Sequence, residues 1–148
     1  MGRRLLIGIG NRLRGDDGVG PRVADSLAAR GDGDFETLAV HQLTPELAAV
    51  VADAAAVVFV DACPAENAVA LEPLAAAGDA PGGAFSHQLS PAQLLALSQA
   101  LYGRCPPAWQ LLIPAPRLEL CDELSDAAAA AMLQALRLLE AWPCMSWH

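Results

Sequence analysis

The sequence predicts one α/β domain, a three-layer sandwich in which a mostly parallel sheet lies between helices. The length of 148 residues suits a single domain that spans residues 1–148. Short apolar runs alternate with segments of helical periodicity, which is typical of a sheet with helices on both faces. The runs 5–9 and 57–60 are continuously apolar, as expected of strands buried on both faces of a parallel sheet.

About five strands are expected in the sheet. The run 57–60, Val-Val-Phe-Val, is the strongest of them, because β-branched and aromatic side chains favour strands. The segment 68–74 is short, and we expect it at a sheet edge. The predicted strands are residues 5–9, 35–40, 57–60, 68–74 and 109–113.

Four helices are expected to connect these strands. In the first, Val19, Val23 and Leu27 recur along one helical face. Thr44 and Ser90 are favoured N-cap residues for the second and third. Gly31 and Pro143 stand where the first and the fourth should end. The predicted helices are residues 19–29, 44–53, 91–102 and 125–141.

Charge and hydropathy exclude several classes of function. The net charge is −8 and lysine is absent, so the basic clusters that bind nucleic acid are missing. No apolar stretch approaches the roughly 20 residues that a membrane span needs. The apolar run at 5–9 is also too short for a signal peptide. We therefore expect a cytoplasmic protein that acts without a membrane.

The four cysteines do not form a recognisable metal or redox motif. They lie far apart, without a C-x-x-C pair, so neither a zinc ribbon nor a dithiol site is indicated. In a reducing compartment the expectation is free, buried thiols. The residues are Cys63, Cys105, Cys121 and Cys144.

The glycine-rich segment 8–20 follows the first predicted strand. A strand that ends in Gly-x-Gly suggests a dinucleotide fold, but the third glycine of that fingerprint would fall at Leu13. Asp16 and Asp17 would also repel a pyrophosphate. We therefore expect no nucleotide here and interpret the loop as a cation-binding one. One of the two aspartates is expected to cap the following helix, which leaves the other free to bind a ligand.

Further candidate ligands follow other strands. Asp61 stands directly after the run 57–60, at the edge of a parallel sheet where ligands bind. A simpler interpretation is that Asp61 hydrogen-bonds the turn 62–64. His87 precedes the third predicted helix, and His41 lies in a similar segment, so local sequence does not separate these two histidines. Asp17, Asp61 and His87 could converge to hold a divalent transition metal, although residue types do not distinguish nickel from zinc, cobalt or iron.

Several segments, taken in order, resemble the [NiFe] hydrogenase maturation endopeptidases, the proteases that process the hydrogenase large subunit. The resemblance rests on their order and spacing over most of the chain. The segments are 8–11 (Gly-Ile-Gly-Asn), 16–20 (Asp-Asp-Gly-Val-Gly), 41–47 (His-Gln-Leu-Thr-Pro-Glu-Leu), 58–62 (Val-Phe-Val-Asp-Ala) and 86–91 (Ser-His-Gln-Leu-Ser-Pro).

The resemblance implies a fold, a site and an activity. The fold is a twisted sheet between helices, and the nickel ligands map to Asp17, Asp61 and His87, which are then also the residues expected to carry catalysis. The activity is removal of a C-terminal extension from the immature large subunit after nickel insertion. The Ni²⁺ is expected to be supplied by the substrate, so that the protease reads it as a checkpoint, and other divalent transition metals can substitute.

The hydrolytic mechanism stays open at this level. A metal can polarise the carbonyl or activate water while a carboxylate acts as base, and Asp16 is a candidate base. Cys63 is a further candidate, as a soft ligand or a nucleophile, although nothing in the sequence indicates an activated thiolate. The chain departs from the family in lacking a glycine before the Leu-Ser at 124–125, and in having Ala115 after Ile-Pro.

Two other functions remain compatible with the sequence. The first is a nickel-sensing chaperone that binds the immature subunit without cutting it. The second is another α/β hydrolase, acting on RNA or peptide esters, although the acidic charge disfavours RNA. The tail 142–148, with two tryptophans, could either dock on the substrate subunit or pack against the sheet.

Overall fold

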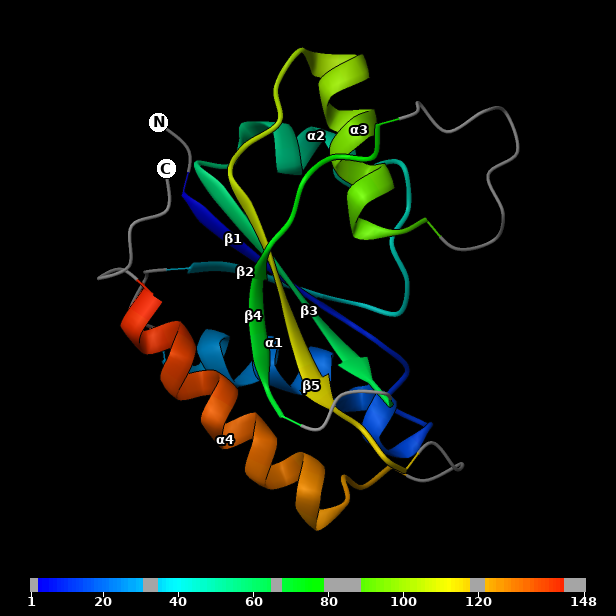
Figure 1. The fold of residues 1–148 in the computed structure, drawn as a ribbon, viewed down its shortest axis with the longest axis vertical. Helices are drawn as coiled ribbons and strands as arrows, with labels where there is room; N and C mark the ends of the chain where they lie inside the picture. The colour runs from blue at the N-terminus through cyan, green and yellow to red at the C-terminus, as the bar shows by residue number, and fades with distance from the viewer. Residues whose placement is uncertain (1–2, 31–34, 65–67, 79–88, 118–121, 143–148) are drawn as a thin grey trace.

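A computed structural model describes residues 3–30, 35–64, 68–78, 89–117 and 122–142 of the chain. It contains a twisted five-stranded sheet with the order β2-β1-β3-β5-β4, flanked by helices on both faces (Figure 1). The strands are β1 (Arg4–Ile9), β2 (Phe35–Val40), β3 (Ala56–Cys63), β4 (Ala70–Pro73) and β5 (Ala108–Pro114). The helices are the 3-10 turn η1 (Gly15–Gly18) and the α-helices α1 (Val19–Arg30), α2 (Leu47–Asp53), α3 (Pro91–Tyr102) and α4 (Asp126–Ala141).

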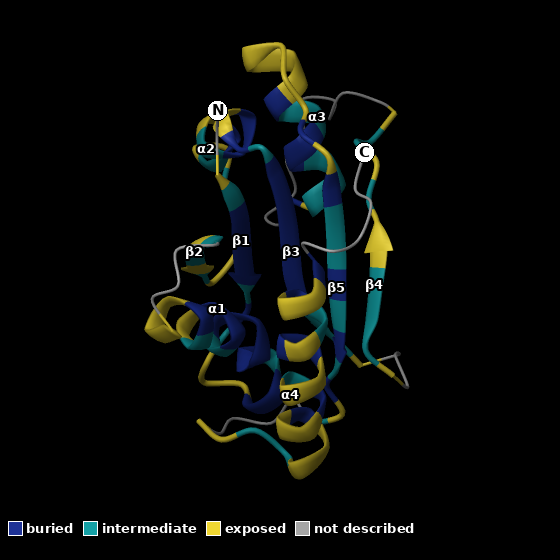
Figure 2. Ribbon diagram, turned by 90° about the vertical axis from the view of Figure 1, so that its left-hand side faces the viewer, coloured by how far each residue is buried: buried dark blue, intermediate teal, exposed yellow. Residues whose placement is uncertain are grey.

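The sheet separates two apolar cores. Alternate residues of a strand point to opposite faces, so Leu6 packs towards α1 and α4 while Leu5 and Ile7 pack towards α2 and α3. The central strands β1 and β3 are buried almost throughout, as the dark blue ribbons in Figure 2 show. This confirms the predicted α/β sandwich of about five strands. It also explains why the runs 5–9 and 57–60 are continuously apolar.

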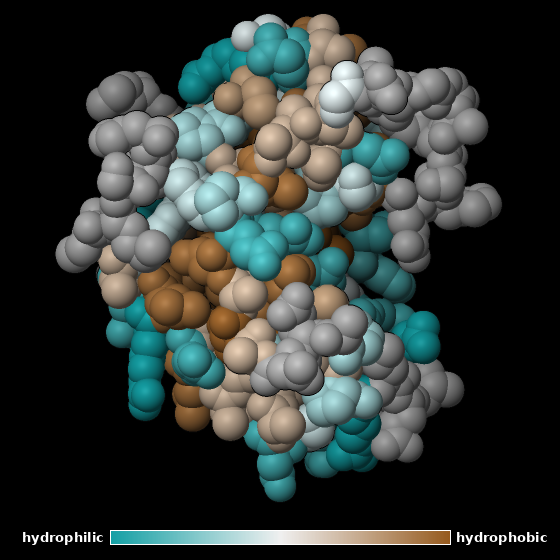
Figure 3. Space-filling model, viewed as in Figure 1, coloured by the Kyte–Doolittle hydropathy of each residue, from teal (hydrophilic) through white to brown (hydrophobic). Residues whose placement is uncertain are grey.

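The strand pairing is parallel except at one edge. β1 pairs in parallel with β2 and β3, and β3 with β5, whereas β4 pairs antiparallel with β5. The short edge strand ends in exposed Glu72 and Pro73, which discourage pairing with another chain. On the face that carries β4, apolar side chains gather between this strand and α4 (Figure 3).

Most predicted elements have the expected positions. The strand 35–40 and the helix 91–102 match exactly, and Ser90 caps the latter through a capping box with Gln93. The predicted ends at Gly31 and Pro143 lie outside the described residues. In the described part of the chain no helix has the length and apolar character that crossing a membrane requires.

The start of the second helix was predicted wrongly. α2 begins at Leu47, and the backbone N–H of Leu47 donates to the carbonyl oxygen of Thr44 over 3.1 Å, closing a separate turn. Thr44 therefore precedes the helix and does not cap it. Its side chain hydrogen-bonds Glu46, which lowers the pKa of that exposed carboxyl group. Threonine is favoured both as a helix N-cap and in such a turn, so the sequence does not distinguish the two.

The C-terminal end of α4 is fixed by Trp142. Its ring is fully buried, stacks on Phe35 with a centroid distance of 5.4 Å and meets Trp109 edge-on at 5.2 Å. The Arg4 guanidinium lies over both Phe35 and Trp142. Of the two alternatives for the tail, packing against the sheet is therefore correct for Trp142. Residues 143–148 lie outside the described part.

The thiols are only partly as predicted. Cys63 and Cys105 are free, but Cys63 is half-buried and Cys105 is exposed. The expectation of buried thiols is wrong for Cys105, because it lies in the exposed connection between α3 and β5. Cys121 and Cys144 are not among the described residues.

Candidate functional site

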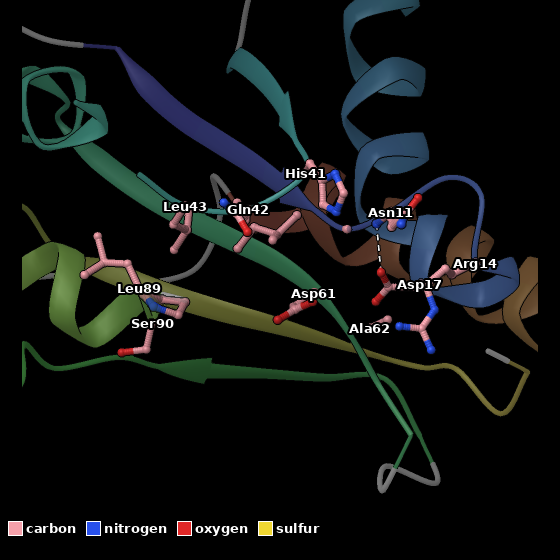
Figure 4. A pocket seen from close by; sticks show the side chains of 13 residues that line it. Asn11, Arg14, Asp17, His41, Gln42, Leu43, Asp61, Ala62, Leu89 and Ser90 are labelled. Carbon is pink, nitrogen blue, oxygen red and sulfur yellow. Dashed lines mark hydrogen bonds between the residues drawn. The ribbon is translucent and has the colours of Figure 1, made fainter. Parts of the chain in front are cut away.

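A cleft of about 470 Å³ opens at the carboxyl ends of the central strands (Figure 4). It lies where the chain order reverses, since β1 connects to β2 on one side while β3 follows on the other. Ligands of open α/β sheets bind at such switch points. The residues that line it are Ile9, Gly10, Asn11, Arg14, Asp17, His41, Gln42, Leu43, Asp61, Ala62, Leu89, Ser90 and Pro91.

The unequal lengths of the strands create this opening. Pairing between β1 and β3 ends at Gly8 and Val60, whereas pairing between β3 and β5 continues to Cys63 and Pro114. The last residues of β3 therefore have a strand neighbour on the β5 side only. The sequence indicated that Asp61 follows the strand. Asp61 belongs instead to this extension and lies inside β3.

Glycines bring the loop after β1 against the strand end. A Cβ at Gly8 would lie 2.1 Å from the carbonyl oxygen of Gly20, and one at Gly10 would lie 1.8 Å from that of Asp17. Both distances are far below contact, so only glycine permits η1 and the start of α1 to approach this closely. The Gly-x-Gly pattern thus serves close packing that places Asp17 at the cleft.

Asp17 is held in position by the backbone of its own loop. Its Oδ2 accepts a hydrogen bond of 2.8 Å from the backbone N–H of Asn11. The side-chain oxygen of Asn11 in turn accepts from the N–H of Leu13 over 2.9 Å. The half-buried carboxylate is therefore anchored on one side, and it lines the cleft (Figure 4).

Asp61 lines the same cleft from β3. Burial raises the pKa of Asp61 to about 6; a hydrogen bond from the backbone of Ala62 opposes the rise, and the negative charge of Asp17 adds to it. The charge of Asp17 thus acts on Asp61 although the two residues lie far apart in the sequence. Ala62 belongs to β3, so its hydrogen bond with Asp61 lies within the strand and not in a turn at 62–64.

Asp16 lies away from the cleft, so its prediction as a catalytic base is wrong. It is completely buried and does not line the cleft. Its carboxylate accepts hydrogen bonds from the backbone N–H of Arg117 (2.8 Å) and from the N–H and the hydroxyl of Ser125 (both 2.7 Å). η1 has no side-chain cap, so Asp16 does not cap its own helix either. It joins the loop after β1 to the start of α4.

Of the two candidate histidines, only His41 belongs to the described residues. His87, the predicted third ligand, lies outside the described residues. His41 follows β2 and lines the cleft beside Asn11 (Figure 4). Within the described ranges no group of three His, Cys, Asp or Glu residues is close enough to hold a metal ion. The described chain therefore brings two of the three predicted ligands, Asp17 and Asp61, to one cleft.

Two features of the site were not predicted from the sequence. Arg14 lines the cleft close to Asp17, and Leu43 and Leu89 form an apolar end beyond Asp61 (Figure 4). The sequence carried no signal for Arg14, because a lone arginine in a loop is ordinarily a solvated surface residue. Cys63, the candidate soft ligand or nucleophile, does not line the cleft.

Neither a protein-family profile nor a curated protein matches the sequence. Solved structures do match, and they do so over nearly the whole chain. A hydrogenase 2 maturation peptidase from a Thaumarchaeota archaeon is 26% identical, with a TM-score of 0.68, over 97% of this chain and 99% of that one. A [NiFe] hydrogenase maturation protease HycI from Thermococcus kodakarensis is 25% identical, with a TM-score of 0.65, over 95% and 89%.

A third match shows the same fold at lower identity. The hydrogenase maturating endopeptidase HybD from E. coli is 21% identical, with a TM-score of 0.68, over 96% of this chain and 93% of that one. These matches confirm the resemblance that the sequence segments indicated. The fold is that of the hydrogenase maturation proteases.

Proposed function

We propose that this chain, with the fold of the hydrogenase maturation proteases, is an endopeptidase that removes the C-terminal extension of a [NiFe] hydrogenase large subunit. One observation carries the proposal: Asp17 of η1 and Asp61 of β3 line a single cleft of that fold. The similar solved structures, two of them at least 25% identical, support a protease function.

The proposed signal for cleavage is nickel that the substrate already holds. Asp17 and Asp61 offer carboxylate oxygens on one cleft, and we propose His87 as the third ligand. Carboxylate and imidazole groups suit a borderline divalent ion, so this set of donors fits nickel. Nickel brought in by the substrate would supply Lewis acidity beside the peptide bond to be cut.

Asp17 and Asp61 are both held in position by the backbone around them. The Asn11 N–H holds Asp17 in one orientation, and β3 holds Asp61. These two carboxylates would therefore orient the incoming nickel-bearing segment across the cleft. Positioning of this kind lowers the entropic cost of bringing the reacting groups together.

A mass measurement on the large subunit tests the proposal. The purified chain is incubated with nickel-loaded precursor and with nickel-free precursor, and each subunit is then weighed by mass spectrometry. Loss of a C-terminal peptide from the nickel-loaded precursor alone is the expected result. An unchanged mass with formation of a stable complex would instead identify a nickel-sensing chaperone.

Variants of the two carboxylates make the test specific. Asp17→Asn and Asp61→Asn preserve side-chain volume and should abolish cleavage while leaving the domain folded. Asp53→Asn is the matched control, because Asp53 is an exposed carboxylate at the end of α2, outside the cleft. Cleavage by the Asp17→Asn and Asp61→Asn variants at the rate of the control would refute the assignment of the site.

A further inference from the structure

Arg14 occupies an unusual position for an exposed arginine. It is the residue that precedes η1, where its carbonyl oxygen accepts from the N–H of Asp17 and its own N–H donates to the carbonyl oxygen of Asn11, both over 3.1 Å. These two bonds fix its backbone in the loop that carries Asp17. Its side chain reaches the cleft wall beside Asp17 and Ala62 (Figure 4).

The guanidinium of Arg14 has no ion pair or hydrogen bond with any described residue. This sets it apart from its neighbour Arg12, which pairs with Asp25 over 2.6 Å. Arg30 pairs with Glu140, and Arg22 donates to the carbonyl oxygen of Asp122. Arg14 therefore keeps its donors available at the one place where a substrate would meet them.

The charges in the cleft differ between its centre and the end at Arg14. Asp17 and Asp61 make the centre of the cleft negative, in a chain whose net charge is already −8. An anionic group of a substrate would be repelled there. At the Arg14 end the guanidinium offers a planar fork of donors that matches a carboxylate. The opposite end offers apolar contacts from Leu43 and Leu89, and the described residues that line it there include no basic side chain.

We propose that Arg14 is a specificity-determining residue that binds a carboxylate of the substrate peptide and so fixes its direction in the cleft. The inference rests on the proposed endopeptidase function and adds the chemistry of the segment that is recognised. The carboxylate can belong to an Asp or Glu side chain near the cleavage site or to the terminus of the extension. In either case the segment lies with its anionic end at Arg14 and crosses Asp61 towards Leu43 and Leu89.

Steady-state cleavage of the precursor by Arg14→Gln tests the inference. Arg12→Gln is the matched control, because it removes the same charge from the same loop but from an arginine already paired with Asp25. Loss of one charge-assisted contact should raise KM about tenfold, equivalent to about 1.4 kcal/mol, with kcat unchanged. Arg14→Lys should fall between Arg14→Gln and wild type, because lysine keeps the charge but loses the fork.

The source of the carboxylate is separated by altered precursors. One carries Asn and Gln in place of the acidic side chains of the extension, and another ends in an amide. Wild type should bind the precursor that lacks the recognised carboxylate about tenfold more weakly than the unaltered precursor. The Arg14→Gln variant should bind these two precursors equally well, because it lacks the partner of that carboxylate. Wild-type affinity for both altered precursors would overturn the inference, as would a fall of kcat at constant KM in Arg14→Gln.

A binding measurement separates this inference from the proposed function. The affinity of wild type, Arg14→Gln and Arg12→Gln for the uncut precursor is measured by calorimetry. Binding without cleavage that depends on Arg14 and not on Arg12 would refute the endopeptidase and uphold the carboxylate site. Cleavage with equal affinities for Arg14→Gln and Arg12→Gln would do the reverse, and a wild-type protein that neither binds nor cuts the precursor would refute both.

Discussion

The carboxylate of Asp16 and the backbone amide of Ser125 are joined by a hydrogen bond of 2.7 Å across 109 positions of sequence. The Ser125 hydroxyl donates to the same carboxylate and accepts from the N–H of Ala128 at the start of α4. The backbone N–H of Asp16 donates to the carbonyl oxygen of Arg117 over 2.7 Å, and the N–H of Arg117 donates to the Asp16 carboxylate over 2.8 Å. Asp16 thus joins the loop after β1 to the start of α4, while its neighbour Asp17 lines the cleft.

Asp16→Asn is expected to destabilise the domain. The variant replaces a buried carboxylate that accepts three hydrogen bonds, so its amide group would face donors. We expect the free energy of unfolding to fall by about 2–4 kcal/mol in urea titrations. Asp53→Asn, at an exposed carboxylate, is the control and should unfold like wild type. Normal stability of Asp16→Asn combined with lost cleavage would contradict the structural role.

Asp61 should make the stability of the domain depend on pH. Its pKa is about 6 in the folded state against 3.8 ordinarily, so the folded state binds the proton more tightly. Stability contributed by the protonated form is present below about pH 4 and is lost as the pH rises to about 6. The free-energy cost at pH 7 is at most about 3 kcal/mol, which is the equivalent of this rise in the pKa.

Asp61→Asn should remove this cost, because an amide does not ionise. We expect the variant to be more stable than wild type by about 1–3 kcal/mol at pH 7.5, and the difference to shrink towards pH 4. Urea unfolding of both proteins at the two pH values measures it. An equal difference at both pH values would mean that ionisation of Asp61 is not its source.

Substitution of the two histidines decides between them. We expect His87→Gln to reduce cleavage by about a hundredfold or more, as for loss of a metal ligand, and His41→Gln by less than about tenfold. The measurement is the rate at which the large subunit loses mass. The comparison is sharp because His41 itself lines the cleft. If His41→Gln abolishes cleavage and His87→Gln does not, His41 is the ligand.

Gly8→Ala should be strongly destabilising. Its Cβ would lie 2.1 Å from the carbonyl oxygen of Gly20, which is backbone at the start of α1 and cannot move aside as a side chain could. We expect a loss of more than about 3 kcal/mol in the free energy of unfolding. Gly78→Ala is the matched control, since its Cβ would meet nothing within 4 Å. Similar stability of the two variants would contradict this account of the loop.

Trp142→Ala should unfold the C-terminal end of α4 from the sheet. The ring is fully buried against Phe35 and Trp109, and its loss leaves a large cavity. We expect a cost of about 3–5 kcal/mol, read as a lower melting temperature in calorimetry. Leu133→Ala on the same helix is the control, because Leu133 is 59% exposed. A Trp142→Ala variant as stable as Leu133→Ala would return Trp142 to a docking role.

Local sequence signals predict the layered α/β fold and most of its elements. Continuous apolar runs such as 57–60 mark strands buried on both faces, and the capping residue Ser90 sets the start of α3, because these signals are local. The start of α2 was missed, since Thr44 can open a turn as readily as a helix and local preference does not distinguish them.

The separate roles of the polar residues depend on contacts that form only when the chain folds. Asp16 and Asp17 are chemically identical neighbours, and their different roles depend on Ser125 and Arg117, which approach from more than 100 positions away. The open donors of Arg14 likewise depend on which carboxylates come within reach. Burial and pairing are properties of the folded surface, so a sequence pattern can identify candidate ligands but does not say which of them meet.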